Sequence, residues 1–328
     1  MKSVAFFTNK GGVGKTTLVT NLAASLSLNN KKKILLIDAD PQSNATQYMF
    51  DDEVIEQIYD DRAYETIYDF VKPVRIAKTL PDKIPKLRSK EFGVDVVLGD
   101  PRLALLEDFL ASDWSGGDTR GLKTTFLFKR ILEKCGDYDF VFFDMGPSLG
   151  SINRSVLLSS DYFVIPLSID IFSVRAIENI VDWVKDWKKK LNAKLTFIEN
   201  HEDLEVSSTE VQLDLLGYVS QQYTAKRDKG GERRAVRAFD RIKRSIPDAL
   251  SKSGLDGVDG ISEEYNFELG EIPNLHSLIP MSQSAHKPIF RLKSSDGVVG
   301  AHFSKVSEAC EIYRSIGARF LENIEAHG

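Results

Sequence analysis

The stretch "NKGGVGKTT", residues 9–17, combines glycines, lysines and hydroxyl side chains in the spacing of a phosphate-binding loop. Glycine lets the backbone turn tightly, so that successive N–H groups point at phosphate oxygens. Lys15 can then reach the β- and γ-phosphates of a nucleotide, and the hydroxyl of Thr16 can ligate Mg²⁺. The helix expected from about residue 15 adds its amino-terminal dipole. The residues expected to hold the nucleotide are Gly11, Gly12, Val13, Gly14, Lys15, Thr16 and Thr17.

This loop departs in two ways from the common G-x-x-x-x-G-K-[ST] pattern. Asn9 stands where the first glycine usually lies, and a second lysine, Lys10, follows it. A phosphate-binding loop needs only one lysine, which Lys15 already supplies. The residues of the loop alone therefore leave open what the second positive charge does.

Three aspartates end apolar runs that are typical of buried strands. Asp38 and Asp40 follow "KILLI", and Asp144 follows "DFVFF". An aspartate at a strand end beside a phosphate-binding loop suits coordination of Mg²⁺ through water. A second aspartate nearby can orient and activate an attacking water. One such aspartate is usually an ordinary turn residue, but three of them together with the loop predict a nucleoside triphosphatase.

Short apolar runs that alternate with helical patterns indicate the elements that position these residues. The predicted strands are residues 3–8, 33–38, 94–99, 139–144, 162–167, 194–198, 215–220 and 276–280. Strands that are apolar throughout are buried on both faces, which indicates a parallel sheet covered by helices. The pattern predicts a doubly wound α/β fold with the ligand at the carboxyl ends of the strands. We expect one domain over residues 1–328, with a largely helical insertion at 51–93 and surface loops at 199–212 and 251–271.

The composition narrows the class of protein. The formal net charge is −5, which excludes a globally basic nucleic-acid-binding protein but leaves room for a local basic patch. Cys135 and Cys310 lie far apart and suggest neither a disulfide framework nor a metal site. No apolar run approaches the roughly 18 residues that span a bilayer, and the amino terminus leads straight into a strand rather than a signal peptide. We therefore expect a cytoplasmic protein.

The motifs "KGGVGKTT", "DADPQSNAT", "DMGPSLG" and "IPMSQSAHKPIF" resemble those of the ParA/Soj and MinD group of deviant Walker A ATPases. The resemblance runs in order from residue 3 to about residue 320. It implies a P-loop fold, ATP and Mg²⁺ as ligands, and a nucleotide-sandwich homodimer in which Lys10 reaches the phosphates of the partner. It also assigns water activation to Asp40, the Walker B role to Asp144 and support of the metal shell to Asp38.

The same resemblance makes weaker assignments around the base. Pro280 and its neighbour Met281 are similar to the late loop that packs on the adenine. Gln221 or Gln222, with Gln222 preferred, falls where related proteins place a base-contacting side chain; an ordinary surface position is an equal alternative. The segments "DMGP" and "QQYTAKRDKGG" differ from the usual family sequences, which indicates a divergent ParA-like subgroup and leaves the partner open.

A basic segment suggests the partner surface. Residues 226–244 carry nine basic and three acidic side chains, a local charge of +6. A helix expected from about residue 231 would place Arg233, Arg237, Arg241 and Arg244 on one face, next to Arg234. Such a stripe suits non-specific contacts with DNA phosphates, as the resemblance also implies, although a solvated face balanced by acids is the alternative. DNA binding would associate the protein with the nucleoid.

The resemblance implies a switch for DNA partitioning or cargo positioning, with a ParB-like or other activating partner. Two alternatives remain: a positioning or regulatory ATPase that acts on a protein complex or membrane without DNA, and a nucleotide-binding protein without hydrolysis. Membrane binding through the carboxy-terminal helix is disfavoured, because residues 308–325 carry four glutamates. Ile312, Ile316, Phe320 and Ile324 lie at four-residue spacing, which predicts a helix packed on the core.

Overall fold

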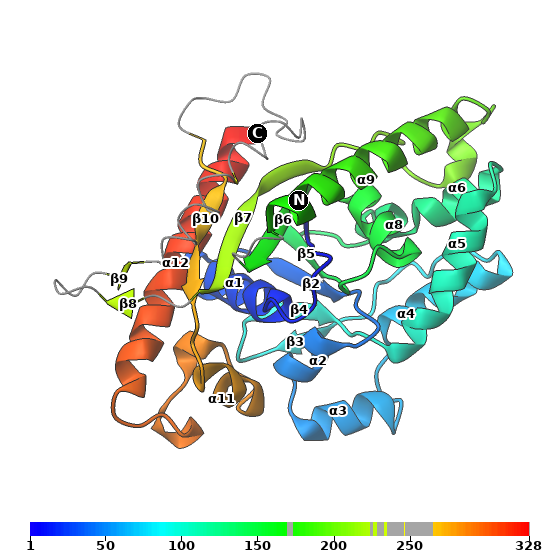
Figure 1. Cartoon of the computed structure of the whole chain (residues 1–328). Helices are drawn as coiled ribbons and strands as arrows, with labels where there is room; N and C mark the ends of the chain where they lie inside the picture. The colour runs from blue at the N-terminus through cyan, green and yellow to red at the C-terminus, as the bar shows by residue number, and fades with distance from the viewer. Residues whose placement is uncertain (169–172, 224–225, 228–232, 235–245, 247–264, 328) are drawn as a thin grey trace.

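An eight-stranded sheet forms the centre of the computed structural model, which describes residues 1–168, 173–223, 226–227, 233–234, 246 and 265–327 (Figure 1). The strand order is β10-β7-β6-β1-β5-β2-β4-β3. The strands are β1 (Lys2–Phe6), β2 (Ile34–Asp38), β3 (Leu87–Ser89), β4 (Val94–Val97), β5 (Phe140–Asp144), β6 (Tyr162–Ser168), β7 (Asp214–Tyr223) and β10 (Glu268–Pro273). Neighbouring strands pair in parallel, except for β3, which pairs antiparallel with β4.

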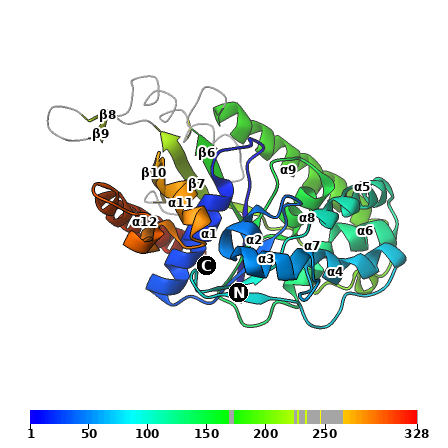
Figure 2. The same cartoon turned by 90° about the horizontal axis from the view of Figure 1, so that it is seen from below.

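Helices cover both faces of the sheet (Figures 1 and 2). One layer contains α1 (Lys15–Asn30), α2 (Asn44–Met49), α11 (Leu278–Ser284) and α12 (His302–His327). The other contains α5 (Glu107–Ser115), α6 (Thr119–Thr125), α7 (Leu127–Leu132), α8 (Ser151–Ser159) and α9 (Ser173–Leu195). The short α3 (Asp52–Tyr59) and α4 (Ile67–Val71) lie between β2 and β3. The apolar residues accordingly divide into two core clusters, one on each side of the sheet.

The central strands explain why the sheet is buried on both faces. Every residue of β2 and β5 is buried. Phe6 and Phe142 meet edge to face with ring centroids 5.0 Å apart, and Phe142 makes a similar contact at 5.5 Å with Phe320 of α12. A strand whose side chains are apolar in both directions is stable only when both faces are covered. The predicted doubly wound α/β fold is therefore confirmed.

Two predicted strands are wrong. Residues 194–198 continue α9 to Leu195 and then turn, because Leu191 and Leu195 bury the same helical face at four-residue spacing. Residues 276–280 enter α11, and the edge strand is β10 instead, which begins inside the segment 251–271 expected to be a loop. Short apolar runs do not separate helix from strand by periodicity. The polar sequence of β10 hid it because an edge strand needs few apolar residues.

The insertions are partly as predicted. Residues 51–93 hold α3 and α4 and also the unpredicted strand β3. Residues 199–212 form a loop with one short 3₁₀ turn at His201–Leu204, as expected for a surface segment. Of residues 251–271, only 265–271 are among those that the structure describes. The division of the chain into one domain stays a prediction.

The basic segment differs from its prediction where it is described. Arg233–Arg234 form a two-residue strand, β9, which pairs antiparallel with β8 (Lys226–Arg227), so these two arginines do not belong to the predicted helix. Two short basic runs separated by Gly230 and Gly231 are typical of a hairpin, a signal that the helical reading overlooked. Arg237, Arg241 and Arg244 lie outside the described residues, and their predicted common face is not tested.

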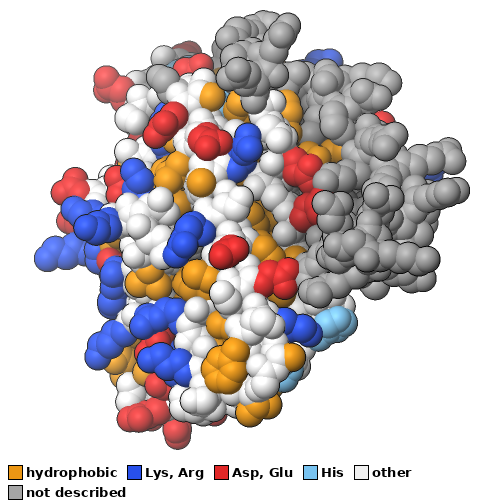
Figure 3. All heavy atoms as spheres, turned by 90° about the vertical axis from the view of Figure 1, so that its left-hand side faces the viewer, with side chains coloured by type: hydrophobic (Ala, Val, Ile, Leu, Met, Phe, Trp, Pro, Cys, Tyr) orange, Lys and Arg blue, Asp and Glu red, His pale blue; other side chains and the backbone are white. Residues whose placement is uncertain are grey.

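The carboxy-terminal helix packs as predicted. Ile316 and Phe320 of α12 are buried in the core cluster, and Ile312 and Ile324 pack against it. The surface over α12 mixes acidic, basic and apolar side chains rather than one continuous basic area (Figure 3). Within the described ranges, no helix has the length and apolarity required to span a bilayer.

Candidate functional site

The glycine loop crosses the carboxyl end of the sheet between β1 and α1. Gly12 and Gly14 adopt positive φ angles of 73° and 84°, which glycine reaches without a steric cost. A Cβ at Gly12 would meet nothing within 4 Å, so the loop is open on the side that faces the cavity. Helix α1 begins at Lys15, immediately after Gly14. The amino-terminal end of the helix dipole therefore lies at the loop, which suits an anion.

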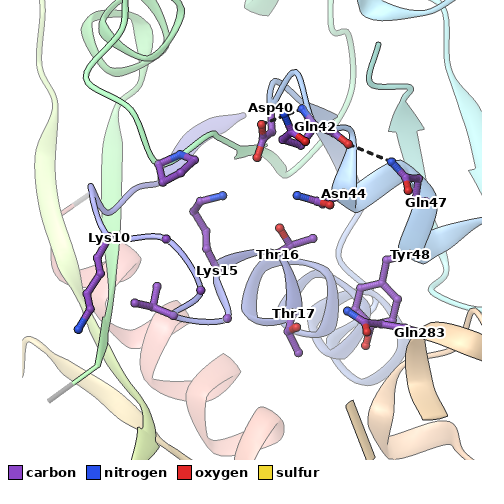
Figure 4. Close-up of a pocket in the computed structure, with 15 residues that line it drawn as sticks. Lys10, Lys15, Thr16, Thr17, Asp40, Gln42, Asn44, Gln47, Tyr48 and Gln283 are labelled. Atoms are coloured by element: carbon purple, nitrogen blue, oxygen red, sulfur yellow. Dashed lines mark hydrogen bonds between the residues drawn. The ribbon is translucent and has the colours of Figure 1, made fainter. Parts of the chain in front are cut away.

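A cavity of about 490 Å³ lies over this loop (Figure 4). Every predicted nucleotide-binding residue of the loop, Gly11 to Thr17, lines it. Its other lining residues are Lys10, Asp40, Gln42, Asn44, Gln47, Tyr48, Pro147 and Gln283. The structure thus brings the glycine loop together with the segment that follows β2 and with α11.

Lys15 and Thr16 both contact the carboxylate of Asp144. The Lys15 Nζ lies 3.1 Å from one carboxylate oxygen, and the Thr16 hydroxyl donates to the other at 2.8 Å. Asp144 is fully buried, and the side chain of Lys15 is only 9% exposed. Because Phe6 pairs with Asp144 in the sheet, the end of β5 lies beside the start of the loop. The predicted grouping of these three side chains is therefore present.

Asp40 lines the same cavity from the turn after β2. Its carboxylate accepts a hydrogen bond from the backbone N–H of Gln42 at 2.9 Å. Burial raises the pKa of Asp40, and the neighbouring Asp144 adds to the rise, while the Gln42 N–H and the charge of Lys15 oppose it. A Cβ at Gly146 would lie 3.3 Å from an Asp40 oxygen, so a glycine lets the loop after β5 approach closely.

Asp38 lies behind the cavity rather than in its wall. One of its oxygens accepts hydrogen bonds from the backbone N–H and the hydroxyl of Thr46, at 2.8 and 2.7 Å. Burial, followed by the charge of Asp144, raises the pKa of Asp38 to about 7. These contacts fasten α2 to the end of β2. Direct metal support by Asp38 stays a prediction, and its visible role is to position α2.

Lys10 extends away from the side chain of Lys15 (Figure 4). It is exposed, and its Nζ donates to the hydroxyl of Ser168 at the end of β6, at 2.9 Å. The two lysines of the loop therefore point to different places. The Nζ of Lys15 contacts the Asp144 carboxylate, whereas the Nζ of Lys10 contacts the Ser168 hydroxyl.

The residues predicted to contact the base do not line the cavity where the structure describes them. Gln221 is buried and, with its amide nitrogen toward the loop, donates to the carbonyls of Val13 and Gly14 at 2.9 and 3.1 Å. The side chain of Gln222 lies outside what the structure describes. Pro280 and Met281 lie in α11 but do not line the cavity; Gln283 of the same helix does. The predicted roles of Gln222, Pro280 and Met281 stay untested.

Several lining residues were missed by the sequence reasoning. Gln42, Asn44, Gln47 and Tyr48 follow Asp40 within eight positions, so their nearness to that aspartate was a usable signal. Pro147 similarly follows Asp144. Gln283 had no comparable signal beyond its place next to Met281. Side chains from three distant segments thus complete the cavity.

The site chemistry suits a nucleotide with a hard divalent cation. Mg²⁺ takes oxygen ligands, and the Thr16 hydroxyl and the Asp144 carboxylate provide them 2.8 Å apart beside the loop. The Gln42 backbone N–H holds the carboxylate of Asp40, which lines the same cavity. The donor set therefore fits the predicted cation.

Comparison with known proteins agrees with this geometry. A family model named AAA_31, described as an AAA domain, matches residues 1–197. The virulence plasmid ParA family protein of Chlamydia psittaci is 31% identical over 187 residues, which cover 56% of this chain. The match spans 63% of that relative, less than two thirds of its length.

Solved structures extend the comparison along the chain. A Corynebacterium diphtheriae protein is 32% identical, with a TM-score of 0.66 over 87% of this chain and 97% of that one. A Borrelia burgdorferi protein bound to AMPPNP has a TM-score of 0.57 over 98% of each chain; at 18% identity this likeness concerns the fold. The match to the family model, which covers more than half of the chain, establishes the family. The chain belongs to the AAA_31 family and is a ParA-like protein of the deviant Walker A group.

Proposed function

We propose that this protein is an ATP-dependent dimerisation switch that hydrolyses Mg·ATP slowly and binds DNA without sequence preference. The observation that carries the proposal is the convergence of Lys15, Thr16 and Asp40 on one cavity over the glycine loop. ATP binding favours the dimer, and hydrolysis, stimulated by a ParB-like or other partner, releases it. The switch serves DNA partitioning or the positioning of cargo.

The side chains divide the work of phosphoryl transfer to water. Lys15 exchanges Asp144 for the β- and γ-phosphates and stabilises the charge that develops on them. Asp40 holds the attacking water in line, with its carboxylate fixed by the Gln42 N–H. The Thr16 hydroxyl and the Asp144 carboxylate hold Mg²⁺, which neutralises phosphate charge. Asp38 keeps α2, and hence the Asp40 turn, in place through Thr46.

The orientation of Lys10 supports the dimer. Lys10 is exposed and lines the cavity, but its Nζ reaches Ser168 at the end of β6, whereas the Nζ of Lys15 reaches Asp144. A lysine placed in this way at the rim of the loop would exchange its contacts within the chain for the phosphates of a facing protomer. This would explain the second lysine of the sequence motif.

Binding and oligomer state test the nucleotide part of the proposal. Lys15→Ala should abolish ATP binding in calorimetric titration; normal affinity would overturn the assignment of the loop. Gel filtration with Mg·ATP should give a dimer for wild type and Asp40→Ala and a monomer for Lys10→Ala. Lys189→Ala, an exposed lysine of α9, is the matched control. A Lys10→Ala variant that dimerises and hydrolyses ATP as wild type does would remove its role across the interface.

Salt dependence tests the DNA part. The hairpin arginines Arg233 and Arg234, with Arg237, Arg241 and Arg244, are the proposed phosphate contacts. Binding of arbitrary duplex DNA should require ATP and should weaken steeply with salt, because phosphate contacts release counterions. Charge reversal of Arg233 and Arg234 should lower the steepness. Intact ATP hydrolysis without DNA binding at low salt would refute this part and favour a protein cargo.

A further inference from the structure

The cavity has two chemically different ends (Figure 4). Lys15, Thr16 and Asp40 lie at one end, where the loop N–H groups fix the phosphates. Thr17, Tyr48 and Gln283 lie at the other end, which is therefore the place for the nucleoside of a bound nucleotide. Tyr48 is the aromatic residue of this wall, and its ring is held edge to face on Phe92 at 5.4 Å.

The phenol of Tyr48 is tied to two other segments of the chain. It accepts a hydrogen bond from the Asn21 amide of α1 at 3.1 Å, and it pairs with the Ser282 hydroxyl of α11 at 2.5 Å. Ser282 donates to the carbonyl of Lys287 at 2.5 Å, so in the second contact Tyr48 is the donor. Burial raises the pKa of Tyr48 to about 12, which keeps the phenol protonated for this purpose.

The remaining groups of Asn21 close the network. Its amide nitrogen also donates to the carbonyl of Thr17 at 2.9 Å, and its oxygen accepts from the N–H of Ile289 at 2.8 Å. Asn21 and Ser282 are fully buried, and Tyr48 is 3% exposed. A buried network in which each group has a partner holds one geometry, because breaking any link leaves a polar group unpaired.

The other end of the same short helix leads to the proposed catalytic turn. Tyr48 belongs to α2, which starts at Asn44. The carbonyl of Asp40 accepts from the N–H of Ser43 at 2.8 Å, and the Gln47 amide donates to the carbonyl of Gln42 at 2.9 Å. Hydrogen bonds thus link α2, which carries Tyr48, to the turn that carries Asp40.

We propose that Tyr48 is a positioning residue that makes the Asp40 turn responsive to the nucleoside half of the ligand. A nucleoside against Thr17, Tyr48 and Gln283 holds the ring, the phenol chain locks α2 to α1 and α11, and the turn that carries Asp40 is held in its hydrolytic geometry. A ligand that has only phosphates leaves this wall empty and the turn less ordered. The inference rests on the proposed ATP hydrolysis.

Two variants break the hydrogen bond between Tyr48 and Ser282, one from each partner. Tyr48→Phe keeps the ring in the cavity and removes the hydroxyl, whereas Ser282→Ala removes the acceptor without touching the cavity. Each should lower kcat for Mg·ATP about tenfold with KM changed less than about threefold, because Asp40 is displaced while most binding contacts remain. The double variant should be no slower than either single variant, because all three lose the same chain.

Tyr265→Phe is the matched control. Its hydroxyl donates to the carbonyl of Leu216 at 2.8 Å, away from the cavity. Tyr265→Phe should leave kcat within about twofold of wild type, since the hydrogen bond that it removes lies away from the site. Values of kcat for Tyr48→Phe and Ser282→Ala that equal the control, or losses that multiply in the double variant, would overturn the proposal.

Hydrogen exchange over residues 40–47 tests the same link without catalysis. In wild type, Mg·ATP should slow exchange there more than Mg·tripolyphosphate does, and in Tyr48→Phe the two ligands should protect equally. Extra protection by ATP that survives in Tyr48→Phe would refute the role of the phenol. Failure of the proposed function shows separately, as absence of ATP binding or hydrolysis in wild type.

Discussion

Replacement of Lys15 by methionine in the nucleotide-free protein probes the electrostatics of the site directly. Lys15 is the cation beside a buried carboxylate: Asp144 is fully buried 3.1 Å from its Nζ, and the charge of Asp144 raises the pKa of both Asp38 and Asp40. Lys15→Met keeps most of the side-chain volume and removes the charge. The carboxylates are then left without their cation.

The expected loss follows from the burial of the pair. Removing one partner of a buried ion pair costs about 3–5 kcal/mol of unfolding free energy, because the other charge stays buried and unpaired. Asp144→Asn should cost less, about 1–2 kcal/mol, because Lys15 keeps Asp40 nearby and the repulsion on Asp38 is relieved. In the double variant both charges are gone, so its loss should be smaller than the sum of the two single losses.

Urea unfolding at neutral pH without nucleotide measures these differences. Wild type, both single variants and the double variant should share one m-value, so that midpoints report stability alone. The reasoning fails if Lys15→Met is less destabilising than Asp144→Asn, or if the two losses add. Either result would mean that solvent, rather than Asp144, satisfies the lysine in the free protein.

Three further predictions concern the frame around the site. Phe320→Ala should lower the unfolding free energy by about 3–5 kcal/mol in urea, because the ring is fully buried against the sheet; a loss below 1 kcal/mol would contradict the packing of α12. Gly150→Ala should cost about 1–3 kcal/mol and slow ATP hydrolysis, since a Cβ there would overlap the Glu107 carboxylate that caps α8; wild-type stability would exclude this overlap. Burial would raise the pKa of Asp100, but hydrogen bonds, chiefly from Arg102, hold it below its usual value. The free energy that ionised Asp100 contributes to folding is therefore present above the unfolded-state pKa of about 3.9 and is lost as the pH falls through the folded-state pKa. Asp100→Asn should make the unfolding free energy less dependent on pH between about pH 5 and 3, about one unit either side of 3.9. An unchanged pH dependence in this range would argue against the role of Asp100.

Local sequence was enough to predict the phosphate end of the site. The loop residues follow one another along the backbone, and their roles depend on glycine torsions and on the start of a helix, which are local properties. Asp40 and Asp144 could also be predicted, because parallel strands that end in polar residues place them at one edge of the sheet. The phosphate end of the site could therefore be predicted from the order of the residues and from the parallel pairing of the strands.

The nucleoside end of the site could not be predicted from local sequence. Gln221 and Gln283 reach the site only because β7 and α11 pack around α1, and no local pattern encodes that packing. The edge strand β10 was missed for a related reason: its polar residues are compatible with a loop until β7 offers them a ladder of hydrogen bonds. Where apolar periodicity is weak, tertiary contacts decide the element.

Residue type and spacing are enough to specify a phosphate-binding loop with two lysines and aspartates at strand ends. How those charges pair with one another depends on the folded chain. Lys15 pairs with Asp144, a residue 129 positions away, while Lys10 turns outward to Ser168. Asp38 is withdrawn behind the cavity to hold Thr46. Which side chain each lysine contacts depends on differences of a few ångström between strand ends. Those distances are set only when the sheet and its helices have packed.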